Sequence, residues 1–263
     1  NHFDYSFELE NALKKSGKIY QGKYEGLYCV GCEKFITKKE LVNGKCPDHQ
    51  KEPQKISETN YFFKLSDFLD RIEKLIKDDK IKIEPKERKN EVLSLLKQGL
   101  EDFSISREKI KWGIPLPFDK KHVTYVWFEA LLSYYTGAGK KQEFWPPEVH
   151  LIGKDILWFH SVIWPAMLMS AGIKLPKMVF AHGWWTFDKE KISKSGGKVI
   201  NVDELVSIAG ADSARYFLFR ETSFGQDGDF SEKALINRHN NELADKLGNL
   251  VSRVSALAEK YGI

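Results

Sequence analysis

Two closely spaced pairs of metal-binding residue types lie near the N-terminus, Cys29-Val-Gly-Cys32 and Cys46-Pro-Asp-His49. Two intervening residues let both members of a pair face one ion from a tight turn, and two such turns supply the four ligands of a tetrahedral Zn²⁺. Because the protein then fills every coordination position, the predicted site is structural and not catalytic. The alternative interpretation, free thiols and a surface histidine, does not account for the paired spacing.

A second candidate is the loop Lys191-Ile-Ser-Lys-Ser195, which Gly196 and Gly197 follow. Two lysines in a glycine-flanked loop can close over a triphosphate, where each ammonium group acts as a point charge on phosphate oxygens. The serine hydroxyls can add hydrogen bonds. Lysine, serine and glycine are also ordinary loop residues, so the loop alone does not distinguish a phosphate site from a plain connection.

The segments before this loop favour a nucleotide site. One predicted buried strand ends at Gly153-Lys-Asp155 and a second ends at His182-Gly183. In open α/β sheets ligands bind beyond the carboxyl ends of the strands, which is where both segments lie. Gly153 would let a ligand approach the backbone, and Asp155 could accept hydrogen bonds from ribose hydroxyls. The alternative role of Asp155 is the N-cap of the following helix.

Aromatic stripes mark two predicted helices. One face carries Trp127, Ala130, Leu131 and Tyr134, and another carries Ile156, His160 and Trp164. Such stripes usually pack in a core, and each residue taken singly is consistent with that. As a set, with a phenol, an imidazole and an indole N–H at their tips, they could line a pocket for an apolar but polarizable side chain.

A strand–helix–strand unit must position these groups. Residues 149–152 and 178–181 are predicted as short buried strands, and residues 156–171 as a strongly apolar helix that Gly172 and Pro176 end. A crossover helix of this kind joins parallel strands of one sheet. The sequence therefore predicts an α/β fold with a doubly wound parallel sheet.

The segments that precede this unit have a different pattern of predicted helices, strands and apolar residues. We predict a helix that Asp4 caps and Gly17 ends, then a stretch at 22–50 that is too poor in apolar residues to form its own core. A strand at 59–64 and two helices separated by Pro85 follow. A Pro/Gly connection at 112–118 marks an organisational boundary.

After residue 200 the pattern is helical, at 203–209, 212–221 and about 231–260. Asp229 with Glu232 is a candidate capping box for the last helix. The apolar positions of this helix recur at three- and four-residue steps, which predicts packing in a bundle. They are Leu243, Leu247, Leu250, Val254 and Leu257.

Composition excludes several classes of protein. The 263 residues are 42% hydrophobic, enough for a packed core, so a largely disordered chain is excluded. The net charge of +4 permits contact with a polyanion without requiring it. No apolar run approaches the roughly 18–20 residues that span a bilayer, so no membrane partner is predicted. Three cysteines, two of them in one Cys-x-x-Cys, favour metal binding in the cytoplasm over disulfides.

Taken together and in order, the motifs resemble those of the methionyl-tRNA synthetases, which are class I aminoacyl-tRNA synthetases with a Rossmann-type catalytic domain. Besides the zinc-ligand pairs, the resemblance rests on Ser106-Arg107 ahead of Trp112-Gly-Ile-Pro, Tyr125-Val-Trp-Phe-Glu-Ala130, Gly153-Lys-Asp-Ile-Leu-Trp-Phe-His160, Trp164-Pro-Ala-Met-Leu168, His182-Gly183, Lys191-Ile-Ser-Lys-Ser195 and Gly248-Asn-Leu-Val-Ser-Arg253. Two mild departures are Leu131 and Ile192, where some members have Pro and Met.

The resemblance implies ATP-dependent activation of L-methionine, with Mg²⁺ accompanying ATP, and transfer of the methionyl group to tRNA(Met). Lys191 and Lys194 would act on pyrophosphate oxygens in the transition state. The implied ATP-binding residues are Gly153, Lys154, Asp155, His182, Gly183, Trp185, Ser193 and Ser195. The implied methionine-binding residues are Trp127, Ala130, Leu131, Tyr134, Ile156 and His160. Asn249 and Arg253 would contact the anticodon, their alternative being a solvated helix face.

The resemblance also implies three parts. These are a connective insertion at 1–111 with a zinc knuckle at 22–50, the second half of the Rossmann domain at 112–200, and linking helices with the start of an anticodon-binding bundle at 201–263. A His-Ile-Gly-His-type signature, which marks the family's first catalytic half, does not occur in the sequence. We therefore expect one part of a larger enzyme, inactive alone, whose partner is the remainder of that enzyme.

Two other functions remain open from the sequence. Class I synthetases for leucine, isoleucine, valine or cysteine share the lysine loop, but not the zinc knuckle combined with the Trp127, Tyr134 and His160 set. A zinc-supported RNA-binding module with a vestigial ATP site would bind tRNA with steep salt dependence and would not bind nucleotide.

Overall fold

The computed structural model describes residues 2–31, 34–36, 41–47, 50–139, 143–187, 190–191 and 201–263. The chain divides into two compact units. Unit 1 comprises residues 1–150 and 156–179, and unit 2 comprises residues 151–155 and 180–263. The aromatic stripes predicted from the sequence lie in unit 1, and the predicted nucleotide-binding segments lie in unit 2.

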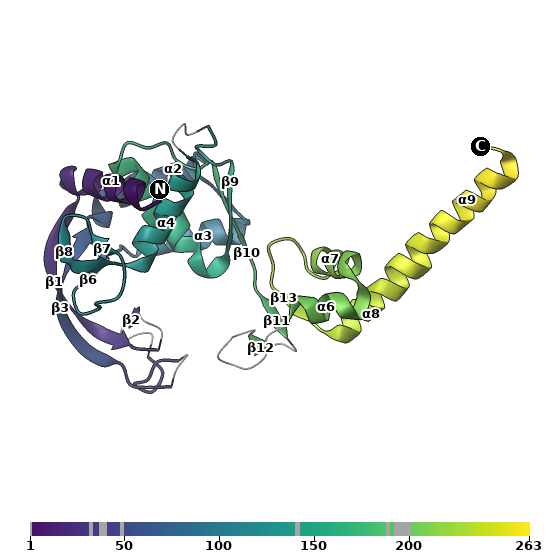
Figure 1. Ribbon diagram of the computed structural model, residues 1–263, viewed down its shortest axis with the longest axis horizontal. Helices are drawn as coiled ribbons and strands as arrows, with labels where there is room; N and C mark the ends of the chain where they lie inside the picture. The colour runs from purple at the N-terminus through teal and green to yellow at the C-terminus, as the bar shows by residue number, and fades with distance from the viewer. Residues whose placement is uncertain are drawn as a thin grey trace. The chain divides into compact units, whose positions relative to one another are not determined.

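A long two-stranded ribbon dominates the first part of unit 1 (Figure 1). Strand β1 (Ile19–Cys29) pairs antiparallel with β3 (Gln54–Phe63) from Ile19↔Phe63 to Tyr28↔Gln54. Strands β2 (Lys34–Ile36) and β5 (Phe103–Ser104) extend the sheet in the order β2-β1-β3-β5. The strand predicted at 59–64 is thus the end of a longer one, and residues 22–29 are held by this ladder and do not depend on metal binding alone.

Helices cover the remainder of unit 1. Helix α1 (His2–Lys15) begins before Asp4, so the predicted cap at Asp4 is wrong, but the predicted end at Gly17 is confirmed by its φ of 73°. Then come η2 (Leu65–Phe68), α2 (Leu69–Lys77), β4 (Lys82–Glu84), α3 (Lys86–Lys97) and α4 (Val126–Gly137). The helices predicted on either side of Pro85 are thus present, and each buries apolar side chains, such as Ile76 (0% exposed) in α2 and Val92 (2%) in α3.

A small antiparallel sheet precedes α4. Strands β6 (Ser106–Arg107) and β7 (Pro115–Leu116) flank β8 (Asp119–Thr124) in the order β6-β8-β7. The Pro/Gly connection predicted at 112–118 therefore contains one short strand. The sheet leads directly into α4, the helix that carries the first aromatic stripe.

The predicted strand–helix–strand unit is present. Strands β9 (Val149–Gly153) and β10 (Met178–His182) are neighbours in the sheet order β4-β10-β9. The connection between them comprises η3 (Lys154–Ile156), the π-helical turn η4 (Phe159–Ile163) and α5 (Trp164–Ser170). The crossover predicted as one regular helix thus contains a wide turn, which shifts the register of the side chains after His160 relative to an ideal α-helix.

Unit 2 contains a second small sheet and a run of helices. Strand β11 (Trp185–Phe187) pairs parallel with β13 (Gly228–Phe230) and antiparallel with β12 (Glu190–Lys191). Helices α6 (Val202–Ala209) and α7 (Ala211–Arg220) match the predicted positions, and α8 (Glu232–Arg238) follows β13. The core of the unit is built from Leu205, Ala214, Phe217, Phe230 and Leu235.

The cap of the last helix differs from the prediction. Ser231 accepts a hydrogen bond from the backbone N–H of Ala234 at 3.2 Å and is the N-cap, so the capping box at Asp229 is wrong. Asp229 instead accepts a hydrogen bond from the hydroxyl of Thr186 across the β11–β13 pair. Serine is also a preferred N-cap residue, and here its hydroxyl accepts from the third residue of the helix.

Helix α8 continues through the π-helical η6 (His239–Gly248) into α9 (Asn249–Tyr261), the long yellow helix of Figure 1. The apolar face predicted to pack in a bundle is exposed, with Leu250 at 59% and Val254 at 56%. The bundle itself therefore stays a prediction. Among the described residues, no helix combines the length and the apolar character needed to cross a bilayer.

Candidate nucleotide and amino-acid sites

Tyr134 on α4 and His160 on η4 are in direct contact in unit 1. The hydroxyl of Tyr134 lies 2.9 Å from Nε2 of His160, and Nδ1 of His160 lies 3.0 Å from the carbonyl oxygen of Ile156. A carbonyl oxygen only accepts, so Nδ1 carries the proton and Nε2 accepts from the Tyr134 hydroxyl. His160 is 0% exposed, and burial lowers its pKa, so its ring is neutral.

A second histidine, His150 on β9, completes this cluster and was not predicted from the sequence. Its ring centroid lies 4.5 Å from that of Tyr134, and its Nε2 accepts from the indole N–H of Trp164 at 3.3 Å. Burial, and secondarily the neighbouring His160, lowers the pKa of His150 to about 4. Two neutral imidazoles and a phenol thus form a polar but uncharged wall.

Of the other predicted pocket residues, Trp127, Ala130 and Leu131 lie on α4, and Ile156 ends η3. Trp127 stacks on Phe159 with ring centroids 4.6 Å apart, and Leu131 is 1% exposed. Trp164 is 0% exposed, so it belongs to the core, where it contacts His150 and Tyr134. Tyr134 is 40% exposed and therefore reaches the surface. His160 contacts both Tyr134 and the carbonyl oxygen of Ile156. Trp127, Ala130 and Leu131 lie on the turns of α4 that precede Tyr134.

The nucleotide-binding segments predicted at the ends of β9 and β10 meet in unit 2. The indole N–H of Trp184 donates to Oδ1 of Asp155 at 3.3 Å. A Cβ at Gly153 would lie 2.6 Å from the same oxygen, so a side chain there would displace the Asp155 carboxylate. His182 donates through Nδ1 to the carbonyl oxygen of Gly183 at 2.7 Å. Trp185, predicted to bind ATP, contacts Phe217 of the unit 2 core at 5.8 Å between ring centroids.

One residue of this region was not predicted from the sequence. Asp227, which directly precedes β13, forms a bidentate ion pair with Nζ of Lys154 at 2.7 and 2.6 Å. It also accepts the backbone N–H of Trp184 at 2.9 Å. Because the two partners are 73 residues apart, no local spacing could have indicated the pair.

The predicted zinc ligands are described in part. Cys29 (3% exposed) and Cys46 (0%) are buried in one small cluster with Ile36. The backbone N–H of Gln50 donates to the carbonyl oxygen of Cys46, and the N–H of Cys46 donates to the carbonyl oxygen of Lys51. Cys32 and His49 lie outside the described residues. Within the described ranges no three His, Cys, Asp or Glu side chains gather as a metal site, so zinc stays a prediction.

Several other predicted site residues can be placed only partly or not at all. Ser193, Lys194 and Ser195 lie outside the described residues. Lys191 is described only as the end of β12, where it pairs with Thr186. Asn249 and Arg253 lie on α9 and are exposed.

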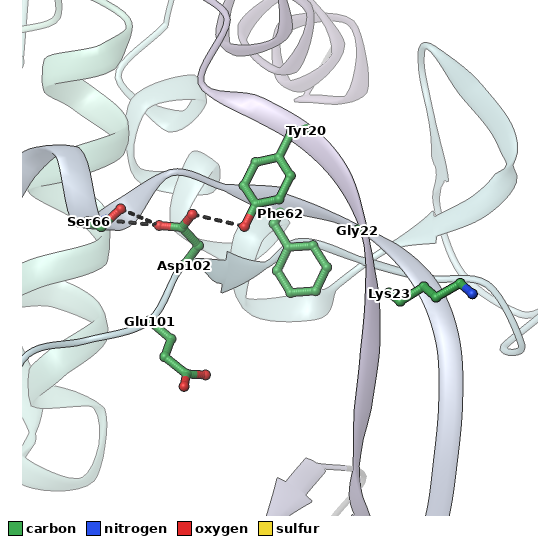
Figure 2. A pocket seen from close by; sticks show the side chains of 7 residues that line it. All are labelled: Tyr20, Gly22, Lys23, Phe62, Ser66, Glu101 and Asp102. Atoms are coloured by element: carbon green, nitrogen blue, oxygen red, sulfur yellow. Dashed lines mark hydrogen bonds between the residues drawn. The ribbon is translucent and has the colours of Figure 1, made fainter.

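A separate groove of about 460 Å³ lies on the β1–β3 ribbon of unit 1 (Figure 2). Its polar side is Asp102, which accepts hydrogen bonds from the Tyr20 hydroxyl at 2.9 Å and the Ser66 hydroxyl at 2.7 Å. Burial and the bond to Asp102 raise the pKa of Tyr20 to about 12. Asp102 therefore fastens the loop before β5 to the ribbon, and the groove contains none of the predicted site residues.

Comparison with known proteins decides the family. The family described as tRNA synthetases class I (M) matches residues 1–58 and 49–255. The chain belongs to this class I synthetase family. The methionine–tRNA ligase of Caldanaerobacter subterraneus subsp. tengcongensis is 49% identical over 95% of this chain and 40% of its own length. That of Fusobacterium nucleatum is 50% identical over 95% of this chain and 41% of its own length.

Solved structures of methionyl-tRNA synthetases are also similar to this chain. The methionyl-tRNA synthetase of Mycobacterium tuberculosis bound by methionyl-adenylate superposes with a TM-score of 0.89 at 41% identity, covering 98% of this chain and 53% of that one. Its apo form gives a TM-score of 0.86. These findings confirm the resemblance to methionyl-tRNA synthetases and the α/β fold with a parallel sheet. The chain spans about two fifths of the length of its curated relatives.

Proposed function

We propose that the protein carrying this sequence activates methionine with ATP and attaches it to tRNA(Met), in the cytoplasm. The observation that carries the proposal is the contact between Tyr134 and His160, two of the residues predicted to bind methionine, in a chain about half identical to methionine–tRNA ligases. Both imidazoles nearby are uncharged, which suits a thioether better than a charged side chain. Sulfur–aromatic contacts add about 0.3–1.5 kcal/mol each.

The chemistry requires no protein nucleophile. The carboxylate of methionine attacks the α-phosphate, so catalysis depends on positioning and on stabilising the charge that develops on phosphate. Asp155, at the end of β9, would accept hydrogen bonds from the ribose, and the backbone at His182 and Gly183 would hold adenine. Lys191 and Lys194 would neutralise the pyrophosphate leaving group, which Mg²⁺ accompanies as part of the ATP substrate.

We also propose that Cys29, Cys32, Cys46 and His49 hold a structural Zn²⁺. The supporting observation is that Cys29 and Cys46, one from each sequence pair, are buried in the same cluster. Thiolates fit this ion, and a closed set of four protein ligands would stabilise the end of the β1–β3 ribbon without taking part in the reaction.

The three-part division at 1–111, 112–200 and 201–263 accompanies the proposed function. Asn249 and Arg253 support it because they are exposed and four residues apart, and therefore lie on one face of α9. We propose that this face reads the anticodon and that the exposed apolar positions of α9 pack within a helix bundle.

The test of the proposed function is exchange of pyrophosphate into ATP, measured with the complete gene product that contains this sequence. Methionine should support exchange, whereas leucine, isoleucine, valine and cysteine should support little. Asp155→Asn should weaken ATP binding by roughly tenfold or more, since hydrogen bonds to a charged group contribute about 1.5–3 kcal/mol. Asp245→Asn removes the same charge from an exposed position of η6 and is the matched control. Exchange that is equal with all five amino acids contradicts the proposal.

A further inference from the structure

The carboxylate proposed to hold the ribose has a cationic neighbour. Lys154 directly precedes Asp155 in η3, and its ammonium group lies 4.4 Å from the centroid of the Trp184 ring. The N–H of that same indole donates to Asp155. The ammonium group and the carboxylate therefore contact one side chain. An unrestrained lysine in this position would have an ion pair with Asp155 within reach and would compete with a ribose for the carboxylate oxygens.

Asp227 binds the ammonium group of Lys154 in the structure. Both of its oxygens bind Nζ of Lys154, at 2.7 and 2.6 Å, so the lysine charge is already compensated. The side chain of Lys154 is 17% exposed and that of Asp227 is 52% exposed. A third bond, from the backbone N–H of Trp184 at 2.9 Å, fixes the carboxylate between the two loops. An ion pair with this geometry differs from the exposed, single-contact pairs that contribute little.

The backbone holds Asp227 in place. A Cβ at Gly183 would lie 2.4 Å from the carbonyl carbon and oxygen of Gln226. The peptide group before Asp227 therefore packs directly against Gly183. The N–H of Gly228 donates to the carbonyl oxygen of Trp184 at 2.9 Å, and β13 continues from there in parallel register with β11. Gly183 therefore has a steric role in seating this segment, besides any contact with a nucleotide.

We propose that Asp227 is a positioning residue for the nucleotide: by holding Lys154 and the backbone of Trp184, it keeps the lysine from pairing with Asp155 and leaves that carboxylate for the ribose hydroxyls. The proposal rests on the proposed function and adds a residue that neither the predicted loop nor the strand ends contain. It also changes the role of Lys154, which acts through its ion pair with Asp227 and not as a ligand of ATP.

Kinetics of pyrophosphate exchange by the complete gene product test the proposal, with ATP affinity measured calorimetrically as a second readout. Asp227→Asn keeps the shape of the side chain but removes the charge that binds Lys154. It should raise the KM for ATP roughly tenfold and leave the KM for methionine unchanged. Asp227→Glu can still reach the ammonium group and should stay within about threefold of the wild-type KM for ATP. The control Asp245→Asn should change neither constant.

A double substitution separates positioning from general damage. In a Lys154→Met background no ammonium group competes for Asp155, so adding Asp227→Asn should change the KM for ATP by less than about twofold. An equal increase in both backgrounds, or no increase from Asp227→Asn in the wild type, would overturn the proposal. If Asp227→Asn does not fold, Asp227→Ala, which also removes the charge, and its double variant with Lys154→Met give the same comparison. Absence of methionine-dependent exchange in the wild type would instead refute the proposed function.

Discussion

Glu10 on α1 is a buried acidic residue of unit 1. Its side chain is 0% exposed, and within the described residues neither carboxylate oxygen has a hydrogen-bond partner. Burial, and secondarily the charge of Glu129, raises the pKa of Glu10 from 4.5 to about 8. The residue is therefore protonated in the folded protein at neutral pH.

Raising the pKa of Glu10 from 4.5 to about 8 corresponds to at most about 5 kcal/mol, since one pKa unit is 1.36 kcal/mol. Because the pKa is higher in the folded state, the unfolded chain loses its proton first as the pH rises. The free energy of unfolding should therefore fall between about pH 4.5 and pH 8, by up to about 1.4 kcal/mol per pH unit. Below this window the stabilisation is fully present, and above it the stabilisation is lost.

The substitution Glu10→Gln keeps the size of the side chain and removes its ionisation. In urea unfolding at pH 5, 6, 7 and 8, the variant should gain stability over the wild type progressively as the pH increases. Glu8→Gln, at an exposed position of the same helix, is the control and should follow the wild type. Parallel stability curves for Glu10→Gln and the wild type across this range would refute the reasoning.

Further predictions follow from the same structure. Tyr134→Phe leaves Nε2 of the buried His160 without its donor, at a cost of about 1–3 kcal/mol, so exchange assays should show a KM for methionine raised about tenfold and an unchanged KM for ATP. In the wild type the KM for methionine should be constant from pH 6 to pH 8, because the pKa of His150 is about 4; a step within that range contradicts a neutral wall. Gly183→Ala should lower the Tm and raise the KM for ATP, because its Cβ would overlap the Gln226 backbone; an unchanged Tm argues against that contact. Cys46→Ser should reduce the zinc content found by atomic absorption and lower the Tm; zinc bound equally by the variant would exclude this ligand.

Local residue patterns were sufficient to predict helices and strands whose bounds depend on residues within the same segment. The crossover between β9 and β10 could be predicted because Gly172 and Pro176 end an apolar helix between two short apolar strands. The helices at 203–209 and 212–221 could be predicted in the same way, from the pattern of their own residues. The end of α1 at Gly17 followed from a residue that tolerates a positive φ.

Pairings between distant segments could not be predicted. Strand β1 alternates poorly and contains Gly22 and Gly26, so only its ladder with β3 reveals it as a strand. The π-helical turn at η4 depends on packing and not on any residue type in the turn. In the candidate site, the sequence identifies His150 only as part of a predicted strand, because its contacts with Tyr134 and Trp164 come from other segments. Asp227 was missed because its partner Lys154 lies on another loop.

In the proposed function, the Tyr134–His160 pair binds methionine and Asp155 binds the ribose of ATP. The most direct test is calorimetric binding of a non-hydrolysable methionyl-adenylate analogue to the complete gene product and to Tyr134→Phe and Asp155→Asn. We predict that the analogue binds more tightly than methionine or adenosine and that each substitution weakens it about tenfold or more. Binding that either substitution leaves unchanged would contradict the claim.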